Sequence, residues 1–482
     1  MKHFTLFLSC FLFLQNVFAQ YTQVPDPNFE QALIDLGIDS EGVLDGQFLT
    51  VDAENVTYLY VDYYNINDLT GIEAFINLEW LDASDNNISE IDLSLISSTI
   101  IWTLRLGNNN LSEIDLSQIP SIVNIGLHHN NFKSISVTNL QHLYILSISY
   151  NPLTNIDLSN SIIQVLEINN TPITNIDLST NTNLRVLEIH ESQIQTLDFT
   201  NNPNLEEVRT SNSPLASINL PNNPNLEILD VDACQLTALD ITNCPSLLDL
   251  ECGDNMLASL DLSNNELLED LSIINNQITS IDLTNSPNIF RFWAINNLIE
   301  GDLDLTSNPI LEDLWLDNNL FTTLDLSQSS ILEQAFLSDN PNLLMVNIKN
   351  GNNTDMASFF ALNCPQFSCL VVDDPLADND NIFVGANTTL VGSVEECNLS
   401  ISVYELQGLI QVYPNPVKNI LHIENNHNIE FEKITVHDIL GKAVLIEKNS
   451  FNQLNLSDIK SGILFLKIET EGGTITKKII KE

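Results

Sequence analysis

The sequence is short of basic side chains. Its 482 residues include 16 Lys and Arg against 64 Asp and Glu, which gives a formal net charge of −48. Residues 21–409 carry 6 basic and 55 acidic side chains, whereas residues 410–482 carry 9 of each. A body this acidic repels phosphate backbones, which makes nucleic acid a poor partner. The change in charge near residue 410 predicts a domain boundary.

Long apolar runs are absent after the first residues. Residues 1–19 contain Lys2, an apolar stretch and the small-residue end Val17-Phe18-Ala19, a pattern typical of a cleavable signal peptide. A lipid anchor on Cys10 is the alternative. No later stretch is long and apolar enough to form a transmembrane segment. We therefore expect an exported protein.

Motifs of catalysis and of metal binding are also missing. The chain has no Gly-rich phosphate loop, no Ser/His/Asp set in register, no Cys-x-x-Cys pair and no His/Cys cluster. The sequence thus predicts a protein that is not an enzyme and that holds no zinc.

A repeat fills most of the chain instead. Residues 268–283 read LEDLSIINNQITSIDL, with apolar residues at the spacing L-x-x-L-x-L and an Asn five residues after the second of them. This second position recurs about every 21 residues in fourteen units. Because side chains alternate along a strand, each unit predicts a short strand, and successive strands should pair in a parallel sheet. The fourteen positions are Leu59, Leu81, Leu104, Ile125, Leu146, Leu166, Leu187, Val208, Leu229, Leu250, Leu271, Phe292, Leu314 and Ala335.

These repeats resemble the leucine-rich repeat superfamily, and residues 65–80, NINDLTGIEAFINLEW, are similar to internalin-type repeats. The resemblance implies a leucine-rich repeat solenoid, a curved superhelix of the α/β type. Its parallel sheet would lie on the concave face, with short strands and turns on the convex face. This pattern is specific for the fold and says little about function.

Residues 25–36 predict a helix that covers the first layer of the stack. Asp26 is suited to the N-cap and Pro27 to the first turn. Phe29, Leu33 and Leu36 would form its apolar face. A solenoid exposes its first apolar layer, so a capping helix is physically expected there.

The repeated Asn predicts a structural ladder. A buried amide at a turn can bond backbone groups of its own and the next repeat. Thr171, Ser192, Ser213 and Cys234 replace Asn in four consecutive units, which predicts the softest part of the stack. The ladder consists of Asn86, Asn109, Asn130, Asn151, Asn255, Asn276, Asn297, Asn319 and Asn340.

A second column holds ten aspartates in the I-D-L-S segments. Our main interpretation is that each carboxylate accepts hydrogen bonds at its own turn. The alternative is that calcium binds along the column, which would relieve the repulsion between neighbouring charges. The ten are Asp92, Asp115, Asp157, Asp177, Asp198, Asp240, Asp261, Asp282, Asp304 and Asp325.

The cysteines divide by their place in the repeat. Cys234, Cys244 and Cys252 occupy repeat positions and are expected to be structural. Cys369 and Cys397 flank the end of the stack and could form a disulfide, which export permits.

Residues 410–482 are a different kind of sequence. They contain YPNPV at residues 413–417, KNILHIE, ITVHDILGKAV at 434–444, SGILFLKIE and a final KKIIK. Together these motifs resemble the C-terminal sorting domain of type IX secretion, type A. The resemblance implies export by the type IX secretion machinery of a Gram-negative bacterium, removal of the domain, and release or attachment at the outer cell surface. The short alternating apolar runs independently predict a small all-β sandwich.

The outward strand positions form columns on the predicted concave face, a surface that solenoids commonly use for binding. Trp293, Trp315 and Phe336 are consecutive in its central column. We interpret them either as binding contacts or as mutual packing under the C-terminal cap. The other candidates on this face are Glu188, Arg209, Asp230, Glu251 and Arg291.

A second aromatic group, Tyr58, Tyr60 and Trp80, lies near the start of the stack, where the N-terminal cap could cover it.

The predicted organisation is a signal peptide at residues 1–19, an N-terminal cap at 20–55, leucine-rich repeats with a C-terminal cap at 56–373, a cap or linker at 374–409, and a sorting domain at 410–482. We predict a secreted or cell-surface interaction protein that binds a protein or a glycan through its concave face, in adhesion or recognition. The alternative is a carbohydrate-binding accessory protein of surface polymer degradation, with the three aromatics as a sugar platform. No cofactor besides calcium is expected.

Overall fold

A computed structural model describes residues 20–96, 100–138, 140–377, 379–398, 410–425, 431–439, 442–448, 451–470 and 473–482. The predicted signal peptide, with Cys10, lies outside these residues. The chain divides into two compact units, the first ending at Met256 and the second beginning at Leu257.

An N-terminal cap opens the first unit. β1 (Tyr21–Gln23) pairs antiparallel with β2 (Gln47–Leu49), while α1 (Pro27–Asp35) and the short α2 (Thr50–Ala53) complete the cap. The carboxylate of Asp26 accepts hydrogen bonds from the backbone N–H of Asn28 in α1 and of Asn67 in the first repeat, at 2.8 and 2.6 Å. Asp26 therefore caps the helix and also fastens it to the stack.

The apolar face of α1 is shorter than predicted. Phe29 and Leu33 are fully buried. Leu36 follows the helix as its C-cap and is 43% exposed, so its predicted place on the buried face is wrong. The next residue, Gly37, has φ +68°, and this left-handed turn directs the chain away before Leu36 can pack.

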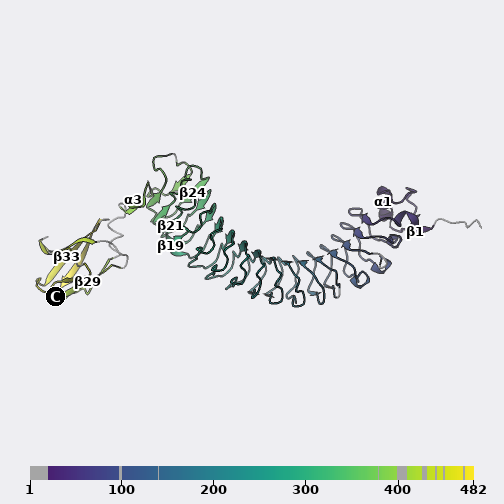
Figure 1. Ribbon diagram of the computed structural model, residues 1–482, viewed down its shortest axis with the longest axis horizontal. Coiled ribbons are helices and arrows are strands. Elements are labelled where there is room, and N and C mark those ends of the chain that lie inside the picture. The colour runs from purple at the N-terminus through teal and green to yellow at the C-terminus, as the bar shows by residue number, and fades with distance from the viewer. Residues whose placement is uncertain are drawn as a thin grey trace, which may run out of the picture. The chain divides into compact units, whose positions relative to one another are not determined.

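The repeats of the first unit form a parallel sheet in which each coil supplies one strand of three residues (Figure 1). One residue at the centre of each strand is a predicted repeat position, and all ten are fully buried. The strands are β3 (Tyr58–Tyr60), β4 (Trp80–Asp82), β5 (Thr103–Arg105), β6 (Asn124–Gly126), β8 (Ile145–Ser147), β10 (Val165–Glu167), β11 (Val186–Glu188), β13 (Glu207–Arg209), β15 (Ile228–Asp230) and β16 (Asp249–Glu251).

Short elements close the coils of the first unit behind this sheet. Of the seven elements described there, three are single 3₁₀ turns and four are short strands. The elements are η1 (Ile72–Ala74), η2 (Leu93–Ile96), η3 (Leu116–Gln118) and the parallel pairs β7 (Ser134–Ser136) with β9 (Asn155–Asp157) and β12 (Thr196–Asp198) with β14 (Ser217–Asn219).

The second unit repeats this arrangement with two parallel sheets. Its main sheet consists of β17 (Asp270–Ser272), β18 (Arg291–Trp293), β20 (Asp313–Trp315), β22 (Gln334–Phe336), β24 (Ser358–Ala361) and β26 (Ile382–Val384). Its second sheet consists of β19 (Glu300–Asp304), β21 (Leu320–Asp325), β23 (Met345–Asn347), β25 (Cys369–Val371) and β27 (Thr389–Val391). The chain is thus a parallel β-solenoid of about 16 turns.

The main sheet continues past Ala335, the last predicted repeat position. Phe359 in β24 pairs with Ala335, and Ile382 in β26 pairs with Phe359. The intervals from Ala335 to Phe359 and from Phe359 to Ile382 are longer than the usual 21 residues. The repeat pattern therefore did not reveal these two strands. The segment predicted as cap or linker, residues 374–409, therefore begins with a further coil.

A column of left-handed residues turns the chain out of the main strands from β3 to β24. Fifteen non-glycine residues in this column have φ between 49° and 62°. Ten are Asn or Asp, the non-glycine residues that tolerate this conformation best, which explains how a chain with 16 Gly builds so many tight turns. The column is Tyr63, Asp85, Asn108, His129, Tyr150, Asn170, Glu191, Asn212, Ala233, Asp254, Asn275, Asn296, Asn318, Asp339 and Asn363.

The next position along the chain is the Asn ladder. Asn297 is representative: its side-chain oxygen accepts from the N–H of Ile278 at 3.1 Å, and its amide nitrogen donates to the carbonyls of Ile273 and Ala294 at 2.8 and 3.3 Å. Ile278 and Ile273 belong to the preceding coil. Each amide thus joins its own coil to the preceding one, and the prediction that it reaches the next one is wrong.

A second amide ladder, which the sequence did not reveal, runs behind the main sheet. The side chain of Asn202 donates to the carbonyls of Leu178 and Asn181 in the preceding coil, at 3.1 and 2.8 Å. Asn181 and Asn223 do the same in their coils. All three are buried and lie in the stretch where the first ladder lacks Asn. Hydrogen bonding between coils therefore continues there through a different column.

The ten aspartates of the other column cap their own turns. In each, one carboxylate oxygen accepts from the backbone N–H two residues ahead, at 2.9 to 3.1 Å. The Ser or Thr at that place also bonds the carboxylate, which lowers the pKa of residues such as Asp198 and Asp282. The structure thus contains the turn interactions of our main interpretation.

The end of the repeats is covered by α3 (Val394–Asn398). Cys397 in α3 forms a disulfide with Cys369 in β25, with Cα atoms 5.6 Å apart. Both sulfurs lie in a small buried cluster with Val371 and Val391. The predicted cysteine pair thus fastens the helix to the last strands of the second sheet.

The C-terminal residues form two antiparallel sheets around one apolar core. The first contains β28 (Ile410–Tyr413), β29 (Ile420–Asn425) and β32 (Gln453–Asn455), and the second contains β30 (Phe431–Asp438), β31 (Ala443–Glu447), β33 (Gly462–Thr470) and β34 (Gly473–Lys481). Asn415 of the YPNPV motif donates to the carbonyl of Lys478 at 3.0 Å and accepts from the N–H of Ile480 at 2.8 Å. This explains why YPNPV and the final KKIIK occur together.

Replacing Ala233 by Gly should stabilise the protein. A Cβ atom in the left-handed conformation costs about 1 kcal/mol, which Gly avoids. The matched control is Ala238→Gly in the same coil, where φ is not positive and Gly should cost about 0.5–1 kcal/mol. Denaturant unfolding of both variants measures the difference, and equal destabilisation by the two would contradict the role of the left-handed column.

Asn202→Ala should lower the free energy of unfolding by about 1–2 kcal/mol, because a buried carbonyl loses its donor. Asn204 stands in the same turn but is exposed and donates one bond, to Thr182. Asn204→Ala should therefore cost less than about 0.5 kcal/mol. Thermal and urea unfolding test the pair, and an equally small effect at both positions would remove the second ladder as a source of stability.

Candidate functional site

Five aromatic side chains stand in register on consecutive strands of the second unit. The sequence predicted Trp293, Trp315 and Phe336, and strands β24 and β26 add Phe360 and Phe383. We call these five residues the aromatic stripe. The last two escaped the sequence analysis because their coils are longer than the others.

The rings of the stripe pack against one another along the sheet. Successive centroids lie 5.0, 5.4, 5.4 and 4.5 Å apart. Three of the four contacts are stacked, and Trp315 meets Phe336 edge to face. The first four rings are partly buried and Phe383 is 43% exposed. The mutual packing that we considered for the first three aromatics is therefore present, and their contact with a partner stays a prediction.

One carboxylate fixes both indoles. The Nε1–H of Trp293 donates to Asp313 at 3.2 Å, and that of Trp315 donates to the other oxygen of Asp313 at 2.7 Å. Buried or half-buried indole N–H groups need an acceptor. Asp313 supplies it to both rings and thereby sets their orientation.

Arg291 borders the stripe. Its guanidinium lies 3.1 Å from Asp270 and 4.9 Å from the ring centre of Phe290. It is also 6.0 Å from the ring centre of Trp293. Arg291 is thus held by one ion pair and by aromatic contacts at the start of the stripe.

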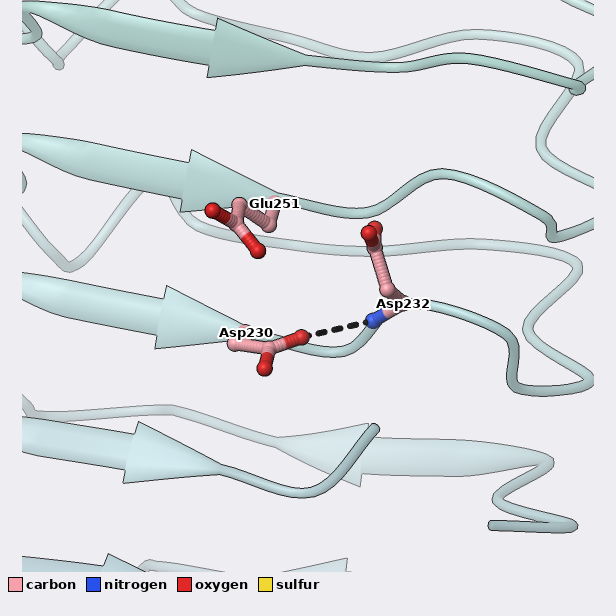
Figure 2. A group of neighbouring side chains, drawn as sticks. All are labelled: Asp230, Asp232 and Glu251. Atoms are coloured by element: carbon pink, nitrogen blue, oxygen red, sulfur yellow. Dashed lines mark hydrogen bonds between the residues drawn. The ribbon is translucent and has the colours of Figure 1, made fainter. Parts of the chain in front are cut away.

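The predicted acidic residues lie in the first unit. Asp230 and Glu251 come together with Asp232, and carboxylate oxygens of the three lie within 4.8 Å of one another (Figure 2). We call these three residues the acidic cluster. Asp232 escaped prediction because it follows its strand, outside the column that holds Asp230 and Glu251.

Burial and mutual repulsion raise two pKa values in the acidic cluster. Burial, followed by repulsion from Asp230 and Asp249, raises the pKa of Glu251 to about 7. Burial likewise raises the pKa of Asp232 to about 6, although the N–H of Gly253 opposes the change. Of the part of the chain that the structure describes, this cluster is where a metal ion could be held, because its oxygens suit a hard cation.

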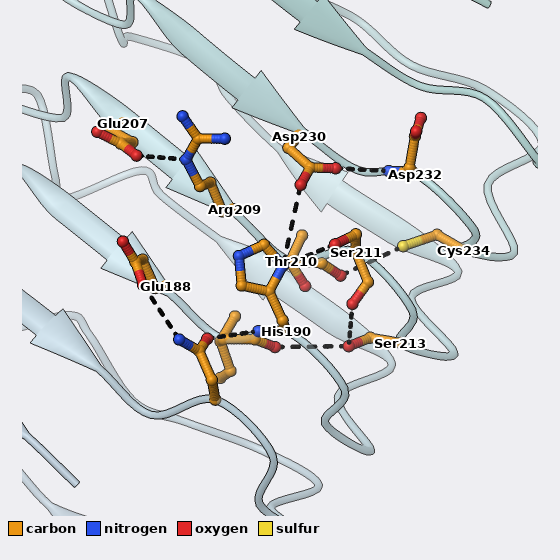
Figure 3. Close-up of polar contacts among 12 residues, drawn as sticks. Glu188, His190, Glu207, Arg209, Thr210, Ser211, Ser213, Asp230, Asp232 and Cys234 are labelled. Atoms are coloured by element: carbon orange, nitrogen blue, oxygen red, sulfur yellow. Dashed lines mark hydrogen bonds and ion pairs between the residues drawn. The ribbon is translucent and has the colours of Figure 1, made fainter. Parts of the chain in front are cut away.

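The neighbours of the cluster are engaged in their own contacts (Figure 3). Arg209 pairs with Glu207, and Glu188 accepts from the amide of Asn169 at 3.1 Å. Nδ1 of His190 lies 2.6 Å from Oγ of Ser211 and 3.9 Å from the carboxylate of Asp230. The predicted residues thus form two groups, acidic with Arg209 in the first unit and aromatic with Arg291 in the second.

The N-terminal aromatic group is open. Tyr58 and Tyr60 are 49% and 47% exposed, so the prediction that the cap could cover them is wrong. Trp80 lies between their rings, with centroids 6.4 and 6.3 Å away, and the guanidinium of Arg105 lies 4.9 Å from the Trp80 ring.

Comparisons with known proteins separate the two parts of the chain. The family model for the secretion system C-terminal sorting domain matches residues 411–482. Residues 411–482 are such a sorting domain. It marks the chain for export, to the surroundings or to the cell surface. No curated protein matches the chain.

Solved structures resemble the repeats in fold. The functional domain of InlJ from Listeria monocytogenes is 19% identical with a TM-score of 0.56, over 96% of this chain and 99% of that one. A TDR receptor is 19% identical with a TM-score of 0.51, over 69% and 70% of the two chains. The plant peptide hormone receptor RGFR1, in complex with RGF2, is 20% identical with a TM-score of 0.50, over 62% and 57%. The repeats ahead of the sorting domain therefore share the leucine-rich repeat fold of these structures.

Among the described residues, no helix has both the length and the apolar character that crossing a membrane requires.

Glu251→Gln should stabilise the protein in a pH-dependent way. The pKa of Glu251 is raised in the folded state, so its protonation favours folding at low pH, and this contribution is lost as the pH rises through about 7. The variant should match the parent near pH 4 and exceed it by about 1–2 kcal/mol near pH 8. Glu227→Gln, an exposed change outside the cluster, is the control. A constant difference across this pH range would contradict the assignment.

Proposed function

We propose that the exported repeats recognise a protein partner outside the cell or at the outer surface of a Gram-negative bacterium, through the aromatic stripe. The observation that carries this proposal is the alignment of five aromatic side chains on consecutive strands, at one face of a sheet. Large aromatics dominate the energetics of protein interfaces, and exposed contiguous apolar surface is uncommon on proteins that bind nothing.

The surroundings of the stripe indicate the chemistry of the partner. Asp270 and Asp313 flank the first rings, and burial raises the pKa of Asp317 beside them. Arg291 is the basic group at this border. A partner with apolar side chains next to basic ones would therefore meet complementary charge around an apolar centre.

The stacking of the rings favours a protein over a glycan. A sugar platform uses open ring faces, whereas the faces of Phe336 and Phe360 cover each other at an interplanar angle of 4°. The contact of Phe360 with Phe383 has an angle of 9°. Faces that cover each other are closed to a sugar ring, which favours the side chains of a protein as the partner.

The solenoid supports binding rather than catalysis. Stacked coils offer a long rigid surface on which single residues vary without altering the core. Oγ of Ser211 and the carboxylate of Asp230 both approach Nδ1 of His190, whereas a catalytic triad places the hydroxyl and the carboxylate at opposite ring nitrogens. We propose that the protein is not an enzyme.

The stripe can be tested by photo-crosslinking. The full chain carrying benzoylphenylalanine at Phe336 is incubated with the secreted and surface proteins of the producing culture. We expect a discrete adduct, reduced at least about tenfold by Trp293→Ala with Trp315→Ala, because each hot-spot residue contributes about 2 kcal/mol or more. Benzoylphenylalanine at Leu267, which is exposed outside the stripe, is the control.

Two outcomes would count against the proposal. Equal crosslinking from the two positions would show that the stripe has no selective role. A glycan array that binds the parent chain and fails to bind the double Trp variant would instead support the carbohydrate-binding alternative. Thermal unfolding of the variants establishes that the fold survives.

A further inference from the structure

Two adjacent histidines follow β6, in the turn that leaves the main sheet of the first unit. β6 ends at Gly126, and His128 and His129 come directly after Leu127. Their Nδ1 atoms are 3.3 Å apart, and their ring planes meet at 89°. His129 is exposed and His128 is half-buried, so solvent reaches both side chains. We call these two residues the histidine pair.

The distance between the two nitrogens suits a metal ion. Zinc bonds imidazole nitrogen at about 2.0–2.1 Å in a tetrahedral arrangement, so two of its nitrogen ligands lie about 3.3–3.4 Å apart. The Nδ1 atoms of the histidine pair already have this separation. When they are hydrogen-bonded, one proton lies between them and one ring is the unprotonated acceptor. A metal ion can take the place of that proton.

The backbone of the histidine pair is held by the preceding coil. The carbonyl of His128 accepts from the N–H of Asn108 at 2.8 Å, and the carbonyl of His129 accepts from the N–H of Asn109 at 3.2 Å. The ladder amide of Asn130 also donates to the carbonyl of His128, at 3.3 Å. Ligands on a rigid backbone lose little freedom on binding, so the solenoid prepares the two histidines for a common ion.

Both imidazole rings are also packed in place. The ring of His129 stacks on Tyr150 of the next coil, with centroids 4.1 Å apart and an interplanar angle of 16°. The ring of His128 covers Gly107 of the preceding coil, where any Cβ atom would clash with it. The two neighbouring coils therefore keep the Nδ1 atoms close to each other.

The charge around the histidine pair favours a cation. Asp85 and Glu167 are near enough to attract positive charge at His128, and Arg105 opposes them. Residues 21–409 carry 55 acidic against 6 basic side chains, which draws cations toward the whole body. Within the described residues, no third His, Cys, Asp or Glu places a ligand atom within 4.8 Å of both nitrogens, so water would complete the coordination.

We propose that the histidine pair binds a divalent transition-metal ion such as zinc, with Nδ1 of His128 and Nδ1 of His129 as its two protein ligands. Imidazole is a preferred ligand of zinc, copper and nickel. On binding, the proton between the nitrogens leaves Nδ1 for solvent, and Nε2 of the same ring takes up a proton. Both rings thus remain neutral ligands.

This site differs from the two groups described above. The acidic cluster offers three carboxylates, whose oxygens suit a hard cation. The histidine pair lies in the first unit and does not depend on the aromatic stripe. The proposal departs from the expectation that the protein holds no zinc, which rested on motifs. Two adjacent histidines match none of the usual ligand spacings.

Zinc alone is the probe, titrated into the full chain against a coloured zinc chelator. Excess calcium in the buffer occupies oxygen sites such as the acidic cluster, because calcium prefers oxygen and zinc prefers imidazole. We expect the zinc ion of highest affinity to lie at the histidine pair. Crystals soaked in zinc should then show an anomalous diffraction peak about 2.0–2.1 Å from each Nδ1 atom.

Single substitutions identify the ligands. His128→Asn and His129→Asn should each weaken zinc binding at least about tenfold, because even an outer contact of a metal site contributes about 10–100-fold. Asn is common at the left-handed position of His129, so the turn is kept. His142→Asn changes an exposed histidine of the same unit outside the pair, and this matched control should leave the affinity unchanged.

The proposal is overturned if either variant of the pair binds zinc like the parent, or if His142→Asn weakens binding as much as they do. An anomalous peak at the acidic cluster alone, or no peak, would equally overturn it. Unfolding temperatures near that of the parent show that the variants are folded, and the diffraction test on the parent does not depend on them.

Discussion

The fold depends on hydrogen bonds and apolar contacts between one coil and the next. A single coil has an apolar edge and a row of unpaired backbone groups, and it can bury neither by itself. Asn297 shows how the structure meets this constraint, because one amide bonds the backbone of two successive coils. Behind the sheet, the side chain of Asn202 bonds two backbone carbonyls of the preceding coil. The nearly constant period of the sequence follows, since successive coils must bring the same positions together.

This constraint explains what could be predicted. Leu59 and the thirteen positions in register with it all lie at the centres of main-sheet strands, because core positions must repeat when their neighbours do. The sorting domain was recognisable from motifs that the fold brings together, such as Asn415 with the last strand. The left-handed column and the second ladder were missed because single positions in a turn carry no apolar signal. Phe360 and Phe383 were missed because the last coils depart from the period.

The candidate sites were harder to predict for the same reason. Outward columns are free to vary, so the pattern says where a side chain points but not which neighbours it joins. Asp232 and Asp313 show this limit: each completes a group whose other members were predicted, yet neither stands out in the sequence. The open position of Tyr58 and Tyr60 also depends on where the cap stops, which periodicity does not specify. The repeated columns stabilise the fold. The residues that depart from the repeat give each coil its own chemistry.

The left-handed column places a side chain at turns where glycine would leave none. A glycine turn ends in a bare backbone, whereas here a side chain leaves fifteen of the turns beside the main sheet. The stacked rings of His129 and Tyr150, with centroids 4.1 Å apart, are one result. The hydrogen bond of Tyr63 with Asp85, the left-handed residue of the next coil, is another. The rim of the solenoid is therefore a second variable surface, and a new specificity could arise there by single substitutions that leave every buried residue untouched.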